Sequence, residues 1–250
     1  MDICNRHLYH EPLIHPACVY HGAPRSALIL GGGEGATARE LLKWNSMERV
    51  VMVDIDGELV GACKEFLPEM HAGAFDDVRS ELIIGDAIDY LDHCKDRFDI
   101  VVCDLSDPVE NSPAANFYTK EYILKCKSVL EENGYLIVQA CAVDPLDIAP
   151  HARMVNTVSS VFNEVASYGS FVPVFDDVWG FIIAGDQKID RRPVPEDIDG
   201  ILAIGITGNL RMFDGTTLLG MMQLPKHVRL AIHENTEIYT LDDKPEVWNY

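Results

Sequence analysis

The sequence predicts an α/β protein built on a doubly wound, mostly parallel sheet. Short apolar runs alternate with helical patterns from residue 26 onward, and strands that alternate with helices typically form parallel βαβ units. The second observation is a glycine-rich turn at residues 31–35, which directly follows the first apolar run and directly precedes a helical pattern. Such a strand–turn–helix unit is typical of the ligand-binding edge of a doubly wound sheet.

The expected elements follow in chain order after residues 1–24, which show no clear period. We expect strands at 27–31, 49–53, 81–84, 98–104 and 135–139, separated by helices at 36–44, 57–66, 87–95 and 119–130, with Asn133 and Gly134 stopping the last helix. A helix at 148–162, strands at 164–173 and 180–184, a polar connector at 185–199, a short strand at 210–213 and a helix at 225–233 complete the chain. This pattern predicts an N-terminal segment, residues 1–24, and one α/β domain, residues 25–250.

The charge balance limits the classes of partner. The 250 residues include 40 acidic and 20 basic side chains, for a formal charge of −20. Because a phosphate backbone attracts a basic face, this balance argues against a nucleic-acid partner. It is compatible with a cationic ligand, although a solvated acidic surface produces the same balance. No apolar run approaches the ~18 residues of a membrane span, so we expect no membrane contact.

Cysteines and histidines indicate a reduced, metal-free protein. Seven cysteines are scattered along the chain without a C-x-x-C pair, and the first residues lack the apolar core of a secretory signal. We therefore expect core thiols in a cytoplasmic protein. Histidines at positions 7, 10, 15 and 21 are not accompanied by a cysteine or carboxylate pattern of a known metal site, so we expect no bound metal.

Two acidic residues follow strands beyond the glycine turn. Asp54 ends the second predicted strand about twenty residues after the turn, the spacing at which a carboxylate accepts both hydroxyls of a ribose. The alternative is a helix cap at this strand end, with Asp56 as the capping residue. Asp86 follows the third strand, where an acceptor and a backbone N–H could bind an adenine edge. A helix N-cap is the alternative there, and both roles are compatible.

A second pair of carboxylates follows the fourth strand. Asp104 and Asp107 are three residues apart in a Leu-Ser-Asp-Pro context, which is also a turn signal. If both face the cleft, they form a negative site for an ammonium group, and a carboxylate there can take the proton of an attacking amine. Glu34, inside the glycine turn, would repel a pyrophosphate and thus argues against a dinucleotide. These residues favour a nucleoside-type cofactor with positive charge, such as a sulfonium compound, facing an amine.

The same residues carry a resemblance to a known family. Six segments occur in order: Tyr-His-Glu-Pro-Leu-Ile-His-Pro at 9–16, Gly-Gly-Gly-Glu-Gly-Ala-Thr-Ala-Arg-Glu at 31–40, Val-Asp-Ile-Asp at 53–56, Gly-Asp-Ala at 85–87, Asp-Leu-Ser-Asp-Pro at 104–108 and Trp-Gly-Phe at 179–181. Together they resemble the polyamine aminopropyltransferases, the spermidine, thermospermine and spermine synthases. The similarity extends to residues 213–215 and 224–226.

The resemblance implies a Rossmann-like, methyltransferase-type sheet and transfer of an aminopropyl group from decarboxylated S-adenosylmethionine to putrescine or spermidine, with release of 5′-methylthioadenosine. It implies Asp104 as the proton acceptor. It implies contacts to the co-substrate from Gly31, Gly33, Glu34, Asp54, Ile55, Asp86, Ala87 and Pro113, and contacts to the polyamine from Tyr9, His10, Glu34, Asp104, Asp107 and Phe175. The family's acid at position 34 binds the aminopropyl amine and disfavours the carboxylate of ordinary S-adenosylmethionine.

Two departures from the family pattern affect these expectations. The family usually carries an N-terminal β-rich domain before the Tyr-His-Glu segment, and this sequence begins only eight residues before Tyr9. We therefore expect that domain to be absent, which leaves a homodimer as an open possibility. Phe175 stands where many spermidine synthases have a Tyr, which bears on the choice of amine. The alternatives are a truncated, non-catalytic binder of nucleoside or polyamine, an S-adenosylmethionine-dependent methyltransferase and, less favoured, an NAD-dependent oxidoreductase.

Overall fold

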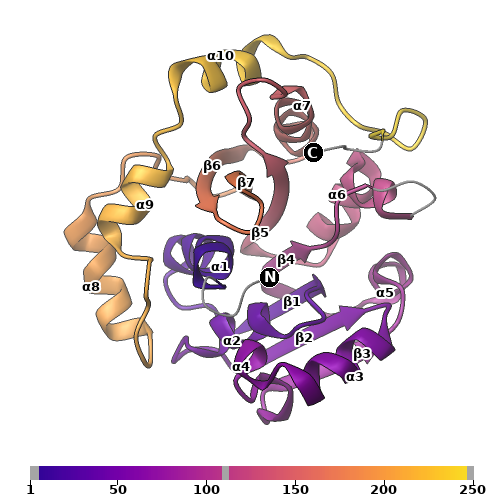
Figure 1. Ribbon diagram of the computed structural model, residues 1–250, viewed down its shortest axis with the longest axis vertical. Helices are drawn as coiled ribbons and strands as arrows, with labels where there is room; N and C mark the ends of the chain where they lie inside the picture. Colours follow the sequence, from indigo (N-terminus) through magenta and orange to yellow (C-terminus); the bar gives the residue numbers. More distant parts are fainter. Residues whose placement is uncertain (1–5, 109–112, 247–250) are drawn as a thin grey trace.

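A seven-stranded sheet forms the centre of the computed structural model, which describes residues 6–108 and 113–246, with only the backbone of residue 113 (Figure 1). The strand order is β3-β2-β1-β4-β5-β7-β6. The strands β1 (Ser26–Gly31), β2 (Arg49–Asp54), β3 (Ser80–Ile84), β4 (Phe98–Asp104) and β5 (Leu130–Ala142) run parallel, whereas β7 (Asp177–Gly185) pairs antiparallel with both β5 and β6 (Glu164–Val172). This confirms the predicted doubly wound, mostly parallel sheet.

Helices connect and cover these strands. In chain order they are α1 (His7–His21), α2 (Ala36–Leu42), α3 (Gly57–Phe66), α4 (Pro68–His71), α5 (Ala87–His93), α6 (Lys120–Ser128), α7 (Ala149–Ser159), α8 (Pro195–Gly205), α9 (Gly215–Met221) and α10 (Lys226–Glu234), with the 3₁₀ turns η1 (Ala74–Asp76) and η2 (Pro113–Tyr118). Figure 1 shows α1 beside the sheet and α8 and α9 further out on the same side. Within the described residues, no helix is both long and apolar enough to span a membrane.

The sheet separates two apolar cores. Along β1, Ile29 packs with α1 and α2 in one core, while Leu28 and Leu30 pack with α6 and α7 in the other. Successive side chains of a strand point to opposite faces, so a strand that is buried on both faces needs apolar residues at every position. This explains why β1, β2 and β4 read as continuous apolar runs.

Several local expectations were wrong. The segment at 1–24, which shows no period, contains α1, a helix with buried residues on all sides and with Pro12 and Pro16 inside it. The expected connector contains the start of α8, and α9 was missed. The helix expected at 119–130 ends at Ser128, and Asn133 and Gly134 lie within β5.

The expected strand at 210–213 is also wrong, and Glu11 explains why. The buried carboxylate of Glu11 accepts backbone N–H bonds from Arg211, Met212 and Phe213 at 2.8–3.1 Å. These N–H groups are therefore satisfied by a side chain of α1 rather than by a neighbouring strand, and the segment passes α1 as irregular backbone.

Candidate active site

The glycine turn lies directly against the end of β4. Gly31 pairs with Asp104 in the sheet, and the N–H of Gly32 donates to the Asp104 carbonyl at 3.0 Å. Gly31 has a φ of 88°, and a Cβ there would lie 2.2 Å from the Asp104 carbonyl oxygen. Only glycine allows this approach. The turn thus brings the backbone at 31–35 next to the side chain of Asp104.

Two hydroxyl groups hold the Asp104 carboxylate. The Tyr9 hydroxyl donates to Oδ1 at 2.8 Å, and the Thr37 hydroxyl donates to Oδ2 at 2.6 Å. Burial raises the pKa of Asp104, and the nearby carboxylate of Glu34 raises it further, whereas His10 and the two hydroxyl bonds lower it. The net direction is upward, so Asp104 is a stronger base than an ordinary Asp.

Glu34 pairs with His10. The Nε2 atom of His10 lies 2.8 Å from Oε1 of Glu34, and its Nδ1 atom lies 2.8 Å from the backbone oxygen of Arg6. Since a carbonyl oxygen only accepts, Nδ1 carries a proton, and a charged ring lets both nitrogens donate. Burial lowers the pKa of His10, but the bond to Glu34 outweighs burial and raises it. Burial opposes ionisation of Glu34, yet the same bond lowers the pKa of Glu34.

A cavity of about 370 Å³ opens at the carboxyl ends of β1, β2, β3 and β4. Five acidic side chains and no basic ones are among the described residues that line it. The acids are Glu34, Asp54, Asp56, Asp86 and Asp104, and the other lining residues include Gly31, Gly33, Ile55, Ala87, Ser106 and Phe117. The sheet therefore gathers the carboxylates that sequence reasoning had placed at separate strand ends, because parallel strands end at one edge.

The sequence left open whether Asp54 binds a ribose or belongs to a helix cap formed by Asp56. Asp56 caps α3 by accepting the N–H of Leu59 at 2.8 Å, so Asp54 is not the cap. Asp54 accepts the N–H of Asp56 at 2.9 Å and lies against Gly33, where a Cβ would lie 2.8 Å from Asp54 Oδ2. Burial raises the pKa of Asp54. The Asp54 carboxylate thus faces the cavity with acceptor capacity to spare.

Asp86 caps α5, where its Oδ1 accepts the N–H groups of Ile88 at 2.7 Å and Asp89 at 3.3 Å. The capping interpretation is confirmed, and a contact to an adenine remains compatible with it because Asp86 also lines the cavity. Ala87 follows as the first buried residue of α5. The side chain of Pro113 lies outside the described residues.

Asp107 and Phe175 lie beside the cavity rather than on its wall, and neither lines it. Asp107 accepts from Gln139 Nε2 at 2.9 Å and from the Tyr118 hydroxyl at 3.2 Å, and burial raises its pKa. The Phe175 ring contacts the Trp179 ring at a centroid distance of 4.3 Å. Asp107 and Phe175 are linked to each other through Gln139 and Trp179.

Gln139 carries these links, although the sequence prediction gave it no role in the site. The amide of Gln139 donates to Asp107 and accepts from Trp179 Nε1 at 3.0 Å, and the Phe175 ring meets the Tyr9 ring edge to face at 6.2 Å. Gln139 was recognised only as the end of a predicted strand. A polar residue at the carboxyl end of a buried strand is the signal that could have identified it.

The six described cysteines form no disulfide with one another. His10, Glu34 and Asp104 are the described group whose ligand atoms come close enough to hold a metal, all within 4.8 Å. Both ring nitrogens of His10 already contact oxygen atoms of the protein. The group is therefore explained by an ion pair beside a carboxylate, and it requires no metal.

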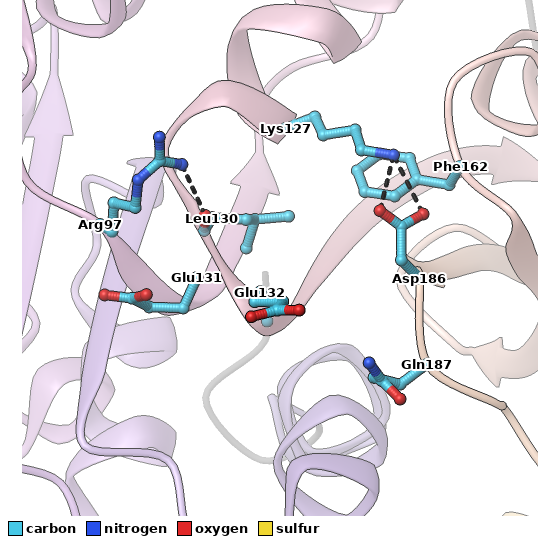
Figure 2. Close-up of a pocket in the computed structure, with 9 residues that line it drawn as sticks. Arg97, Lys127, Leu130, Glu131, Glu132, Phe162, Asp186 and Gln187 are labelled. Carbon is cyan, nitrogen blue, oxygen red and sulfur yellow. Dashed lines mark hydrogen bonds and ion pairs between the residues drawn. The ribbon is translucent and has the colours of Figure 1, made fainter.

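Another cavity, of about 480 Å³, has a different character (Figure 2). It lies near the start of β4 and β5, at the opposite edge of the sheet. Figure 2 shows Lys127 directed at Asp186, and the two form an ion pair at 2.8 Å. Arg97 donates to the carbonyl of Leu130 at 2.9 Å. Since Lys127 and Asp186 neutralise each other there and the glycine turn does not line this cavity, the acidic cavity is the candidate active site.

Comparisons with known proteins identify the family that the chain is similar to. A sequence profile described as "Spermine/spermidine synthase domain" matches residues 6–193. A polyamine aminopropyltransferase of Synechococcus sp. (strain JA-2-3B'a(2-13)) is 45% identical over 247 residues, which cover 96% of this chain and 79% of that protein. One from Aeropyrum pernix is 44% identical over 241 residues, covering 95% of this chain and 76% of that protein.

Solved structures are similar as well. A spermidine synthase from Thermotoga maritima has a TM-score of 0.81 and 27% identity, covering 92% of this chain and 76% of that chain. A spermidine synthase in complex with the transition-state analogue AdoDATO has a TM-score of 0.82 and 26% identity over the same shares of the two chains. The fold is therefore shared with proteins of one family.

Proposed function

Because the chain belongs to the spermine/spermidine synthase family, we propose that it transfers an aminopropyl group from decarboxylated S-adenosylmethionine to a polyamine acceptor, putrescine or spermidine. The products are the extended polyamine and 5′-methylthioadenosine. The observation that carries the proposal is the acidic cavity at the carboxyl edge of the sheet, whose described lining residues include five carboxylates and no basic group. Both reactants are cations, so this charge favours them over a phosphate-bearing cofactor.

The reaction is a substitution at the carbon next to the sulfonium. The lone pair of a neutral amine forms the new C–N bond, the C–S bond breaks, and its electron pair stays on sulfur as the neutral thioether of methylthioadenosine. Amines of this kind have a pKa near that of Lys, ~10.4, so attack at neutral pH requires a proton acceptor. Asp104 is that acceptor in this proposal, and burial already raises its pKa. Holding the two reactants in line supplies a further part of the rate.

The two hydroxyl donors prepare Asp104 for this role. Tyr9 and Thr37 each occupy one lone pair of the carboxylate, and one further lone pair on each oxygen remains for an amine. They also restrict the rotation of the carboxylate before the amine arrives. An aligned base of this kind typically contributes about 10²–10⁴ in rate.

Glu34 is assigned to the amine of the aminopropyl tail. Its carboxylate lines the cavity and is ionised by its bond to His10. An ionised carboxylate attracts an ammonium and repels the carboxylate of ordinary S-adenosylmethionine. This opposes the methyltransferase alternative.

The nucleoside end is assigned to the other strand ends. Asp54 would accept the ribose hydroxyls, and Asp86 with Ala87 would bind the adenine, with Pro113 nearby. Ile55 is 66% exposed on the cavity wall, which suits it to cover the face of a nucleoside. Gly31 and Gly33 would let the backbone approach the ligand without a Cβ in the way.

The acceptor end is assigned to Tyr9, His10, Asp107 and Phe175. Asp107 supplies a second carboxylate for a distant ammonium of the polyamine, and Phe175 supplies an apolar wall for its methylene chain. Phe175 in place of a tyrosine removes a hydroxyl from this wall, so the acceptor preference depends on it. A panel of diamines and triamines of increasing length measures that preference.

The test of the function is release of methylthioadenosine when the protein meets decarboxylated S-adenosylmethionine with putrescine or spermidine. Amine-dependent release supports the proposal. Binding of the nucleoside without release would support a non-catalytic binder, and methyl transfer from ordinary S-adenosylmethionine would replace the proposal. We further propose a cytoplasmic location, supported by the absence of disulfides among the described cysteines, and a homodimer, which sedimentation of the intact chain tests.

A further inference from the structure

A cavity of about 390 Å³ lies between α7, β6 and α10, outside the acidic cavity. Figure 1 shows α10 beside α7, separate from the site that the glycine turn forms. None of the residues that line this cavity lines the acidic one. Its volume falls within the ~300–1,000 Å³ that small-molecule sites usually have.

The charge of this second cavity is opposite to that of the chain. Arg191, Arg229 and His233 line it, and no Asp or Glu is among the described lining residues. The chain as a whole has twice as many acidic as basic residues, 40 against 20, so a cavity whose described lining includes no carboxylate departs from the composition of the chain. An anionic group would be attracted here and repelled by the acidic cavity.

Both arginines keep donors available. In the described part of the chain neither forms an ion pair with a carboxylate. Arg191 donates to the carbonyl of Val165 at 2.6 Å, and Arg229 donates to the carbonyl of Leu224 at 2.7 Å. A guanidinium has five N–H donors, so these backbone bonds orient the two groups and leave most of their donors unused. Guanidinium groups of this kind bind carboxylates through two parallel hydrogen bonds.

The remainder of the wall is mostly apolar. The apolar residues come from α7, β6, α10 and the segment between α9 and α10, and they are Val155, Val165, Met222, Leu224 and Ile232. Behind Ser167, another lining residue, lies His151. Burial lowers the pKa of His151 to about 4, so this histidine is neutral and the positive charge near the cavity comes from the groups on its rim. A lining that combines an apolar wall with two arginines matches a ligand with a hydrocarbon body and one anionic end.

From the opposite charges of the two cavities, the unused guanidinium donors and the apolar wall, we propose that the cavity between α7, β6 and α10 binds an organic carboxylate with an aliphatic body. The carboxylate lies between Arg191 and Arg229, and the hydrocarbon lies against the apolar wall. This site is separate from aminopropyl transfer and does not depend on it.

Calorimetric titration with octanoate tests the proposal. Octanoate should bind the intact protein, whereas acetate, which lacks the body, and octanol, which lacks the charge, should bind at least about tenfold more weakly. The double variant Arg191→Gln, Arg229→Gln should lose about tenfold or more in octanoate affinity. Arg192→Gln is the matched control, because Arg192 is exposed and lies outside the lining.

A second measurement locates the ligand. Octanoate should shift the backbone amide NMR signals of α7, β6 and α10 and leave those of residues 31–35 unchanged. The variants should keep the melting temperature of the unmodified protein, since both arginines are exposed; if the double variant does not fold, each single variant replaces it. Equal octanoate affinity in the arginine variants, equal binding of octanol, no binding up to the solubility limit, or shifts confined to the acidic cavity would each overturn the proposal.

Discussion

Asp104→Asn separates proton transfer from binding in one substitution. The amide has almost the same shape, and its oxygen can still accept the Tyr9 hydroxyl bond that Oδ1 accepts at 2.8 Å. What is lost is the negative charge and the ability to take a proton. Loss of a positioned general base costs about 10²–10⁴ in turnover, which corresponds to about 3–5 kcal/mol in the activation barrier.

Nucleoside affinity should change much less. Asp54 ends β2 and Asp104 ends β4, the strands on either side of β1, so the two carboxylates lie on opposite sides of the glycine turn that follows β1. We expect methylthioadenosine affinity to stay within about threefold, less than ~1 kcal/mol. Single-turnover release of methylthioadenosine gives the rate, and calorimetry gives the affinity.

Two controls make the result interpretable. Burial raises the pKa of Asp104, so the ionised form is unfavourable in the folded state, and the variant should melt no lower than the unmodified protein. Asp76→Asn, at an exposed position outside the cavity, should keep full activity. A parallel loss of turnover and nucleoside affinity in Asp104→Asn would refute its assignment as the base.

Three other substitutions test individual contacts. Thr37→Val removes a hydrogen bond that lowers the pKa of Asp104, so the acidic limb of the pH profile of kcat/KM should move to higher pH. Thr37→Ser keeps a hydroxyl and should restore the original profile. An unchanged profile in Thr37→Val contradicts the role of this bond. Glu34→Gln should weaken the binding of decarboxylated S-adenosylmethionine about 10–100-fold, because a charge-assisted bond is lost. The variant should also discriminate less between this compound and ordinary S-adenosylmethionine, and a binding competition between the two compounds measures that discrimination. The pKa of His151 is about 4 in the folded protein, against a usual 6.5, so between these pH values the unfolded chain binds a proton that the folded protein does not. The free energy of unfolding should therefore fall by about 3 kcal/mol as the pH drops from 6.5 toward 4. Urea unfolding of His151→Gln should show a weaker pH dependence in that window, and an equal dependence would disprove the account.

The sheet could be predicted from sequence because its pattern is local. A strand buried on both faces must be apolar throughout, and β1, β2 and β4 are such runs. The same reasoning failed for α1, because a helix buried on all sides has no polar face and therefore no period of 3.6 residues. Pro12 and Pro16 within it also argued against a helix.

The carboxylates of the candidate site were predictable for a related reason. Parallel strands place their carboxyl ends at one edge, so Asp54 and Asp104 at the ends of separate strands could be assigned to one cavity. Asp86 at the start of α5 followed from the same rule. Gln139 could not be assigned in this way, because its role depends on the bonds that its amide makes to Asp107 and Trp179.

The sequence by itself determined the order of strands and helices, the close turn at the glycines and the acidic character of the edge, since each of these depends on residues near one another in the chain. The tertiary structure alone decided which partners hold those acids. Tyr9 reaches Asp104 across 95 positions and Thr37 reaches it across 67, and His10 reaches Glu34 across 24. Because a hydrogen bond and a pKa depend on distance in space and on burial, neither could be predicted before the chain was folded.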